Sequence, residues 1–213
     1  MSPKAESKER TAGRRPGRPR SAEAHQAILT ATLQVLIDQG YAQMSMERVA
    51  ERAGVGKATI YRRWKNKSEL VAEALTNLRL EEVPSDEGSL RADVLALSKR
   101  QIGLMKAQPR FPRLPPRLLA ESADDPELHA IVRANLVDPI RSLIAELIRR
   151  AIERGEVRKD VELERVVDLL HGPIIYQFLM SGADMSAVTE DYAQSLLDIL
   201  LPGLEPRAKR SRS

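Results

Sequence analysis

The sequence contains no cysteine, so none of its 213 residues can form a disulfide or a thiolate metal site. Stability must therefore come from packing, and the composition suits a reducing compartment. Long apolar runs are also missing, because the longest, residues 169–180, is interrupted and too short to span a bilayer. No apolar run follows the basic N-terminus, so we expect no secretory signal. These absences predict a cytoplasmic protein with no membrane partner.

Aromatic residues make up only 3% of the chain, and no segment alternates for long between apolar and polar residues as a strand would. Charged residues make up 30% and alternate in sign along stretches rich in Leu, Ala, Arg and Glu, which is the composition of helices. The sequence therefore predicts an all-α fold.

Enzyme motifs are absent as well. The three histidines, His25, His129 and His171, lie far apart, and there is no P-loop, Gly-x-Ser-x-Gly or His-Glu-x-x-His motif. We predict no catalytic residue, no metal site and no cofactor, so the sequence gives an enzymatic function little support.

The net charge of +4 hides an uneven distribution along the chain. Residues 1–67 hold 14 Lys or Arg against 6 Asp or Glu, a balance of +8, whereas residues 68–206 hold 16 against 24, a balance of −8. The last seven residues add four positive charges. Because cationic side chains attract polyanions, the N-terminal third is the expected nucleic-acid-binding end.

Composition divides the chain into four parts. Residues 1–20 are poor in apolar side chains and rich in Lys, Arg, Gly and Pro, so we expect a flexible basic arm. Residues 21–80 hold short helices and residues 88–204 hold longer ones, with a linker from residue 83 to 88. Residues 205–213 form a basic tail that we expect to be disordered.

The first two helices of the N-terminal part are defined by their ends. Apolar residues share one face of residues 24–39, and Gly40 supplies the left-handed residue that ends this helix. Ser45 suits an N-cap for the second helix, since its hydroxyl can accept from a backbone amide of the first turn, and Gly54 stops that helix. A helix–glycine–helix arrangement is therefore expected here.

Two further helices follow closely. The third, residues 57–65, is separated from the second by only three residues, and the fourth, residues 66–80, begins with Asn66 and Glu69 in a capping-box arrangement. Two short helices joined by a tight glycine-containing turn, with a longer helix before them, form a helix-turn-helix whose second helix enters the major groove of DNA. The first three helices therefore predict a three-helix DNA-binding domain.

Short motifs across residues 27–75 carry a specific resemblance. They are Gly40 and Tyr41, Val49 and Ala50, Ala53 to Val55, Thr59 to Tyr61, Trp64, and Lys67 to Leu70. In these motifs the stretch resembles the DNA-binding domain of the TetR family of transcriptional regulators. It departs from the family pattern at Gly56, where Ser or Thr is usual, so we expect a weaker cap on the third helix. Trp64 also stands where Phe is usual.

The resemblance implies roles for individual residues. Ser45 and Tyr61 should contact phosphates, and Lys67 should contact one at the start of the fourth helix. The Lys67 role has independent physical support, because a capped helix N-terminus gathers unpaired amides and partial positive charge. The contacts with base edges are expected from Lys57, Thr59 and Arg62.

The N-terminal arm offers a second DNA contact. Residues 14–20 resemble the Gly-Arg-Pro core of AT-hook peptides, and Arg15, Arg18 and Arg20 would lie in a narrow A·T-rich minor groove. A solubilising basic tail with no defined contact explains the same residues equally well.

Beyond the linker, the resemblance implies a helical-bundle domain that binds an effector and forms a homodimer. Its helices are predicted at residues 90–108, 126–154, 160–180 and 186–201, with a Pro-broken segment at 109–122. The dimer candidates are apolar residues of the last two helices, although internal core packing explains each of them as well. They are Val166, Leu170, Ile174, Phe178, Val188, Tyr192, Leu196, Ile199 and Leu200.

An effector cavity is predicted near Pro173, which removes a helical hydrogen bond and kinks its helix. Candidate lining residues are Met105, Phe111, His171, Tyr176 and Gln177. Ordinary core packing is the alternative for these side chains. Residues 109–116 are not expected to form a regular helix and could act as a wall or gate.

Together these patterns predict a dimeric regulator that binds a double-stranded DNA operator, namely a repressor that an unidentified small molecule releases from the DNA. An architectural DNA-binding protein of weak sequence preference is the alternative, with basic arms that bind DNA and an acidic domain that only dimerises. Competition between a promoter fragment and random duplex would separate the two.

Overall fold

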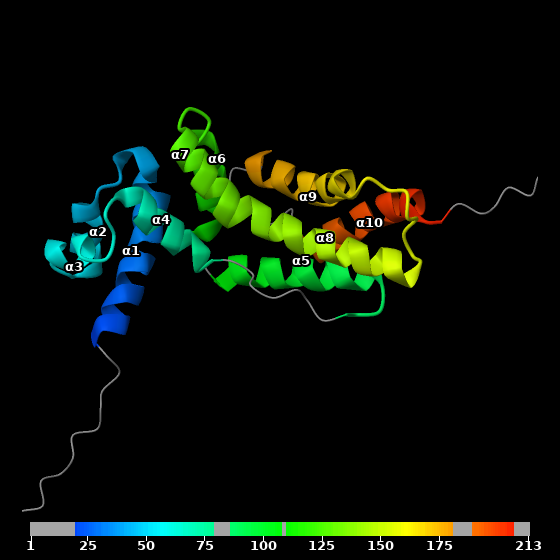
Figure 1. Cartoon of the computed structure of the whole chain (residues 1–213), viewed down its shortest axis with the longest axis horizontal. Helices are drawn as coiled ribbons and strands as arrows, with labels where there is room; N and C mark the ends of the chain where they lie inside the picture. The colour runs from blue at the N-terminus through cyan, green and yellow to red at the C-terminus, as the bar shows by residue number, and fades with distance from the viewer. Residues whose placement is uncertain (1–19, 79–85, 108–109, 181–188, 207–213) are drawn as a thin grey trace, which may run out of the picture.

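The computed structural model describes residues 20–78, 86–107, 110–180 and 189–206. Throughout these ranges the chain is helical with short turns and contains no strand, which confirms the predicted all-α fold (Figure 1). The elements are α1 (Arg20–Gln43), α2 (Met46–Ala53), α3 (Lys57–Tyr61), α4 (Lys67–Thr76), α5 (Leu90–Ala107), the 3₁₀ turn η1 (Phe111–Arg113), α6 (Leu114–Glu121), α7 (Pro126–Val132), the π turn η2 (Arg133–Val137), α8 (Asp138–Arg154), α9 (Leu163–Met180) and α10 (Glu190–Leu204). No helix within those ranges is both long and apolar enough to cross a membrane.

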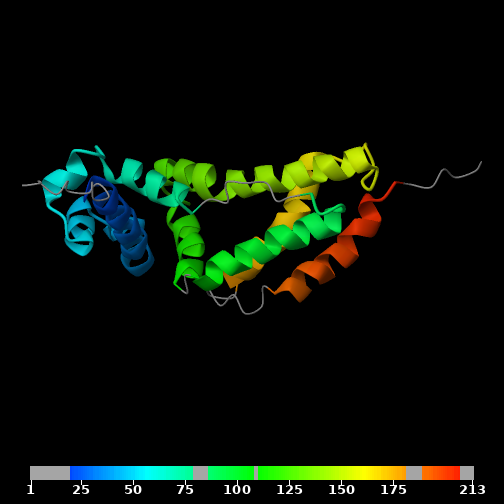
Figure 2. The same ribbon diagram turned by 90° about the horizontal axis from the view of Figure 1, so that it is seen from below.

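The helices pack around two hydrophobic cores. Helices α1 to α4 gather at one end of an elongated molecule, and α5, α8, α9 and α10 extend to the other (Figures 1 and 2). The first core is not confined to the N-terminal helices, because Leu114 and Leu118 of α6 and Leu128 and Val132 of α7 are buried in it. The second core joins α5 to the last three helices. Helices α6 and α7 therefore belong, by packing, with the N-terminal group.

The ends of α1 and α2 follow from local chemistry. Gly40 has φ 81° and ψ 174°, a backbone conformation that interrupts α1 and is essentially restricted to glycine. The Ser45 hydroxyl accepts from the amide of Arg48 at 3.3 Å and caps α2, and Gly54 ends α2 in the left-handed conformation. The predicted ends at Ser45 and Gly54 are confirmed, whereas Gly40 interrupts α1, which continues to Gln43, in an extended conformation of positive φ instead of the expected left-handed one.

Helix α3 is shorter than predicted. It ends at Tyr61, and residues 62–66 form turns in place of a continued helix. Trp64 turns into the first core, where it is 3% exposed, and its indole N–H donates to Glu73 of α4 at 2.6 Å. This tertiary hydrogen bond, which the local sequence does not reveal, joins the turn after α3 to α4. The predicted weak cap is confirmed, because Gly56 provides no side-chain hydrogen bond.

Prolines shape the middle of the chain in two ways. The predicted helix over residues 126–154 is divided by η2, because Pro139 has no N–H to donate to the carbonyl of Asn135 and its ring crowds that carbonyl. The prediction of irregular structure after residue 109 is wrong from Leu114 onward. Pro115 and Pro116 occupy the first turn of α6, where missing N–H groups cost nothing.

The C-terminal helices begin and end a few residues from the predicted positions. Helix α9 begins at Leu163 rather than at residue 160 and contains Pro173 in its interior. Helix α10 begins after its N-cap Thr189, whose side chain accepts from the amide of Tyr192 at 3.1 Å, and continues past Leu201 to Leu204. The beginning of the predicted segment, residues 186–188, lies outside the described residues.

Candidate nucleic-acid interface and ligand cavity

Helices α2 and α3 form a helix-turn-helix whose turn is fixed by the backbone. The Gly54 amide donates to the carbonyl of Glu51 at 3.1 Å, and the Val55 amide donates to that of Ala50 at 3.0 Å. Ile60 is fully buried in the first core and anchors the inner face of α3. Its outer face is consequently directed away from the protein.

Four of the predicted DNA contacts lie together on α3 or at its end. Lys57, Arg62 and Tyr61 are exposed, and Thr59 is half-buried. The Tyr61 hydroxyl donates to the Glu47 carboxylate of α2 at 2.8 Å. This hydrogen bond lowers the pKa of Glu47 and raises the pKa of Tyr61. The hydroxyl proton is thus already engaged, and a phosphate would have to compete with Glu47 for it.

Lys67 lies at the capped N-terminus of α4. The Asn66 side chain accepts from the amide of Glu69 at 2.8 Å, and the Glu69 carboxylate accepts from the amide of Lys65 at 2.8 Å. The Lys67 ammonium donates to the Tyr41 carbonyl at 3.2 Å and lies 4.1 Å from the centre of the Tyr41 ring. Both contacts hold the cation at the end of a helix whose first amides attract anions.

A cluster that the sequence did not reveal supports the turn after α3. His25 of α1 stacks on Trp64 with ring centres 5.4 Å apart and planes inclined by 15°. The His25 Nε2 atom lies 3.0 Å from the Glu73 carboxylate, and its Nδ1 atom lies 3.1 Å from the Arg63 guanidinium. These residues come from three separate elements, so neither helical periodicity nor a short motif connects them. The cluster fixes the orientation of α3 relative to α1 and α4.

The predicted minor-groove contacts are not tested by these observations. Arg15 and Arg18 lie outside the described residues, and α1 begins at Arg20.

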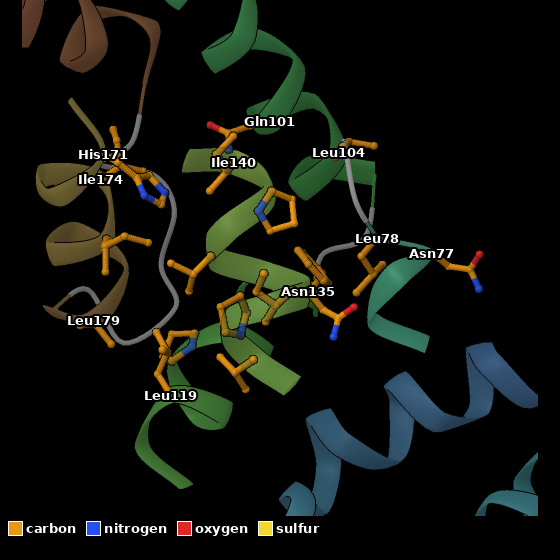
Figure 3. Close-up of a pocket in the computed structure, with 18 residues that line it drawn as sticks. Asn77, Leu78, Gln101, Leu104, Leu119, Asn135, Ile140, His171, Ile174 and Leu179 are labelled. Atoms are coloured by element: carbon orange, nitrogen blue, oxygen red, sulfur yellow. The ribbon is translucent and has the colours of Figure 1, made fainter. Parts of the chain in front are cut away.

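A cavity of about 230 Å³ lies where the two cores meet, between α4, α5, α6, α8 and α9 (Figure 3). Its described lining is mostly apolar and contains no ionisable residue except one histidine. The lining residues are Asn77, Leu78, Gln101, Leu104, Phe111, Pro115, Pro116, Leu119, Val132, Asn135, Leu136, Val137, Pro139, Ile140, His171, Ile174, Ile175 and Leu179.

Two of the five residues predicted for the cavity lie in its wall. Phe111 and His171 line it, whereas Tyr176, which is 61% exposed, and Gln177 do not. Tyr176 lies on an outward face of α9, away from the side that carries His171 and Ile174. The Met105 side chain lies outside the described ones. The sequence missed most of the apolar wall, because no local pattern indicates that α6 and α7 line the same cavity as α9.

Burial governs the charge of His171. Burial and, to a smaller extent, the nearby Arg141 guanidinium lower the pKa of this imidazole from its ordinary value of 6.5 to about 4, while Asp168 opposes the shift. His171 is therefore uncharged at neutral pH.

Helix α6 connects the cavity to the end of α1. Arg117 donates to the Ile37 carbonyl at 3.1 Å and to Glu121 at 3.0 Å. Glu121 in turn accepts from the amides of Tyr41 and Ala42, at 2.6 and 3.0 Å. Both side chains crowd Gly40, where an added Cβ atom would overlap the Glu121 carboxylate and lie 2.7 Å from the Arg117 Nε atom. We call Arg117 and Glu121 the α6 clamp.

The predicted dimer residues divide into four groups. Val166 and Leu170 are buried in the second core, which corrects their assignment to an intermolecular surface, because contacts within the chain already cover them. Ile174 lines the cavity. Val188 lies outside the described residues, and so does the Phe178 side chain. Of the rest, Ile199 is 75% exposed, Tyr192 and Leu196 are half-buried, and Leu200 packs partly against the second core.

Two family models match adjoining parts of the chain. Residues 28–74 match the bacterial regulatory proteins of the tetR family, and residues 84–200 match the tetracyclin repressor-like C-terminal domain. The two matches together cover both the helix-turn-helix and the helices around the cavity.

Individual relatives agree with these matches. The chain is 34% identical over 182 residues to a DNA-binding transcriptional repressor TetR of Mycobacteroides abscessus, covering 83% of this chain and 94% of that protein. The crystal structure of the TetR family transcription regulator SCO0332 superposes with a TM-score of 0.62 at 30% identity, covering 86% of this chain and all of the other. FadR of Bacillus subtilis, solved in complex with stearoyl-CoA, shares the fold with a TM-score of 0.72 at 18% identity, over 85% of this chain and all of FadR.

Proposed function

Because this chain belongs to the TetR family of helix-turn-helix transcriptional regulators, we propose that it is a homodimeric, sequence-specific repressor that a small molecule releases from its DNA operator. One observation carries this proposal: α4 begins at Lys67, shortly after α3 ends at Tyr61, and the two residues that follow its last turn, Asn77 and Leu78, line the cavity. A change in the cavity can therefore displace the surface that meets DNA.

Recognition of DNA is assigned to α3 and the start of α4. Lys57, Thr59 and Arg62 present donors and a methyl group to base edges, while Ser45, Tyr61 and Lys67 bind phosphates on either side. The phosphate contacts fix the depth and register of α3 in the major groove, and the base contacts select the sequence. Acting on the genome, the protein would work in the cytoplasm.

Dimerisation is assigned to the outer faces of α9 and α10. Large apolar side chains are exposed on both helices, including Leu169, Tyr176 and Met180 on α9 and Ile199 on α10. Large apolar side chains exposed together on two helices are typical of interaction sites. Two-fold symmetry would place two copies of α3 in successive major grooves, about 34–36 Å apart.

Release by a ligand is assigned to two connections between the cavity and the DNA-binding helices. In α4, the Thr76 hydroxyl donates to the Asn135 amide oxygen at 2.9 Å, and Asn77 and Leu78, just beyond α4, line the cavity. In α6, Pro115, Pro116 and Leu119 line the cavity while the α6 clamp holds the end of α1. A ligand that favours a different position of α4 or α6 would change the spacing of the two α3 helices.

The proposal is tested by selecting genomic DNA fragments that the purified protein binds, and then measuring affinity by fluorescence anisotropy. A repressor of this type should prefer its selected fragment over random duplex by roughly a thousandfold or more at physiological salt. Replacing Tyr61 and Lys67 together by alanine should abolish this binding with the fold intact by circular dichroism. Lys106→Ala, which removes the same charge from α5, should bind like the parent.

The architectural alternative predicts a different result. Such a protein would bind random duplex nearly as well as any selected fragment, and its affinity would follow the salt concentration alone. Equal affinity of the Tyr61 and Lys67 double variant and the parent would contradict the assignment of the DNA surface itself.

A further inference from the structure

The cavity contains a buried polar side chain whose hydrogen-bonding groups are unused. His171 is only 8% exposed, and no described residue forms a hydrogen bond with either of its ring nitrogens. Buried polar groups without partners are costly and rare in folded proteins. Asn135 in the same wall differs, because its amide oxygen accepts from Thr76 at 2.9 Å and its amide nitrogen donates to the Ile131 carbonyl at 2.8 Å.

The unused imidazole lies in an otherwise uncharged wall. None of the 18 described lining residues is Asp, Glu, Lys or Arg (Figure 3). His171 projects from α9, and Gln101 of α5 provides a second polar group on a neighbouring wall (Figure 3). Because His171 is neutral at physiological pH, it offers one N–H donor and one nitrogen acceptor. These groups suit a neutral hydrogen-bonding partner.

The charged residues close to His171 cannot serve an ionic ligand. Arg141 is the cation that acts on His171, but it lies outside the cavity lining and is paired with Asp168 and with Glu164, the latter at 2.8 Å. A carboxylate in the cavity would lose its hydration without gaining a free cation among the described residues. A buried ammonium group would likewise lack an anion.

The volume limits the size of the occupant. A dry apolar cavity of about 150 Å³ holds a molecule as large as benzene. At about 230 Å³, this cavity has room for a medium-length chain or a substituted single ring, well below the size of a long-chain acyl conjugate.

We propose that the cavity binds an uncharged, mainly apolar molecule whose single hydroxyl or carbonyl group hydrogen-bonds to His171. This assignment of a ligand class rests on the proposed function, in which the cavity is the effector site. The neutral head completes the unused hydrogen bonds of the imidazole, and the apolar body packs against Phe111, Ile140 and Ile174. Charged molecules of the same length are rejected because desolvating their charge is not compensated.

Four eight-carbon probes of similar shape test the assignment at pH 7: 1-octanol, 1-chlorooctane, octanoate and octylamine. Binding is measured on the full-length protein by isothermal titration calorimetry and by the shift of the thermal unfolding midpoint. We expect 1-octanol to bind at least tenfold more tightly than octanoate or octylamine. Equal or tighter binding of either charged probe, or no binding of any probe, would overturn the assignment.

His171→Leu tests the role of the imidazole. The variant should bind 1-octanol about fivefold more weakly than the parent, which is the loss of one hydrogen bond, and should bind 1-chlorooctane as the parent does. His171→Phe keeps the volume of the ring and is a second variant should leucine disturb packing. His129→Leu, at an exposed position of α7, is the control and should change neither affinity. Undiminished affinity of both His171 variants for 1-octanol would contradict the proposal.

A DNA-binding assay separates this inference from the proposed function. Binding of 1-octanol that leaves the affinity for the selected operator fragment unchanged would contradict release by this cavity but uphold the ligand class. Release of DNA by octanoate or octylamine, with no binding of 1-octanol, would uphold release of DNA by a small molecule but contradict the uncharged ligand class.

Discussion

The first core and the cavity of this protein differ in how their buried polar groups are satisfied. In the first core, the Thr32 hydroxyl donates to the Ile28 carbonyl, the Tyr41 hydroxyl bonds to Ser68, and the Trp64 indole donates to Glu73. Where the first core meets the second, His171 is buried beside a cavity with no hydrogen-bond partner among the described residues. Polar groups whose hydrogen bonds are all formed specify one rigid arrangement. A buried polar group without a partner favours binding of a ligand that forms the missing hydrogen bond. The helix-turn-helix end is thus built for a fixed geometry, and the cavity, under the proposed function, for a ligand.

The largest expected effect comes from the joint between these regions. Gly40→Ala would force a side chain into a backbone conformation with φ 81° and ψ 174° and drive its methyl group into the α6 clamp. Strain and overpacking together should reduce the free energy of unfolding by about 3 kcal/mol. The reduction is measured by urea denaturation followed by circular dichroism.

Gly54→Ala provides the matched control for this substitution. Gly54 also has a positive φ, 66°, but an added Cβ atom there meets nothing within 4 Å. The substitution should therefore cost only about 1 kcal/mol, the penalty of the left-handed backbone alone. Similar losses in the two variants would show that the α6 clamp does not press on α1.

A second effect would distinguish the two regions by their response to acid. His171 has its pKa lowered to about 4 in the folded protein and should have the ordinary value of 6.5 when unfolded. Below pH 6.5 the unfolded chain therefore binds a proton that the folded chain cannot, so stability present above pH 6.5 is lost as the pH falls toward 4. Between pH 7 and pH 5 this loss should be about 2 kcal/mol.

Comparison of the parent with His171→Leu isolates this contribution from that of the carboxylates. Asp38, whose pKa is lowered by its hydrogen bond with Arg52, destabilises the fold in acid in the same direction, but it does so equally in both proteins. Urea denaturation at half-unit pH intervals gives the free energy of unfolding of each protein as a function of pH. The difference between the two proteins should be constant above pH 7 and should change below it, because the parent loses more stability. A difference that stays constant down to pH 5 would mean that the folded protein protonates His171 readily.

Features that depend on neighbouring residues could be predicted from the sequence, whereas features that depend on tertiary packing could not. The caps at Ser45 and Asn66 and the turn at Gly54 depend on neighbours within a few residues, so local patterns identified them. An apolar stripe such as the one that holds Val166 and Leu170 specifies that a face is buried, but not whether the covering surface belongs to the same chain. The helical start of α6 was missed because two prolines were taken to break a helix that they instead begin.

Predictions of the functional residues also depended on whether the signal lay in a local motif or in tertiary packing. The outward residues of α3 followed from a motif, whereas the cavity is assembled from the end of α4 and from elements spread between α5 and α9. Phe111 and His171 were among the predicted residues, but most of the remaining wall depends on α6, α7 and η2 facing α9 across the cavity, which no local pattern indicates. The cluster of His25, Trp64 and Glu73 likewise joins elements whose contact no spacing indicates.

The smallest expected effect concerns the surface proposed to bind DNA. One of its contacts, that of Tyr61 with a phosphate, requires a rearrangement and is therefore not fixed in advance. Tyr61 donates its only hydroxyl proton to Glu47, so a phosphate gains that proton only after this bond breaks, and the Glu47 charge repels the same phosphate. Glu47→Gln removes the charge and weakens the bond, so it should tighten operator binding severalfold, about 1 kcal/mol. Glu51→Gln, at an exposed position of the same helix, removes an equal charge without touching Tyr61 and should change affinity less.

Fluorescence anisotropy at several salt concentrations separates the effect of the removed charge from the effect of the freed Tyr61 hydroxyl. A general charge effect fades as the salt concentration rises, while the release of Tyr61 persists. Equal gains in both variants would mean that the Tyr61 to Glu47 hydrogen bond does not restrain the protein on DNA, and that the phosphate contact of Tyr61 forms without rearrangement.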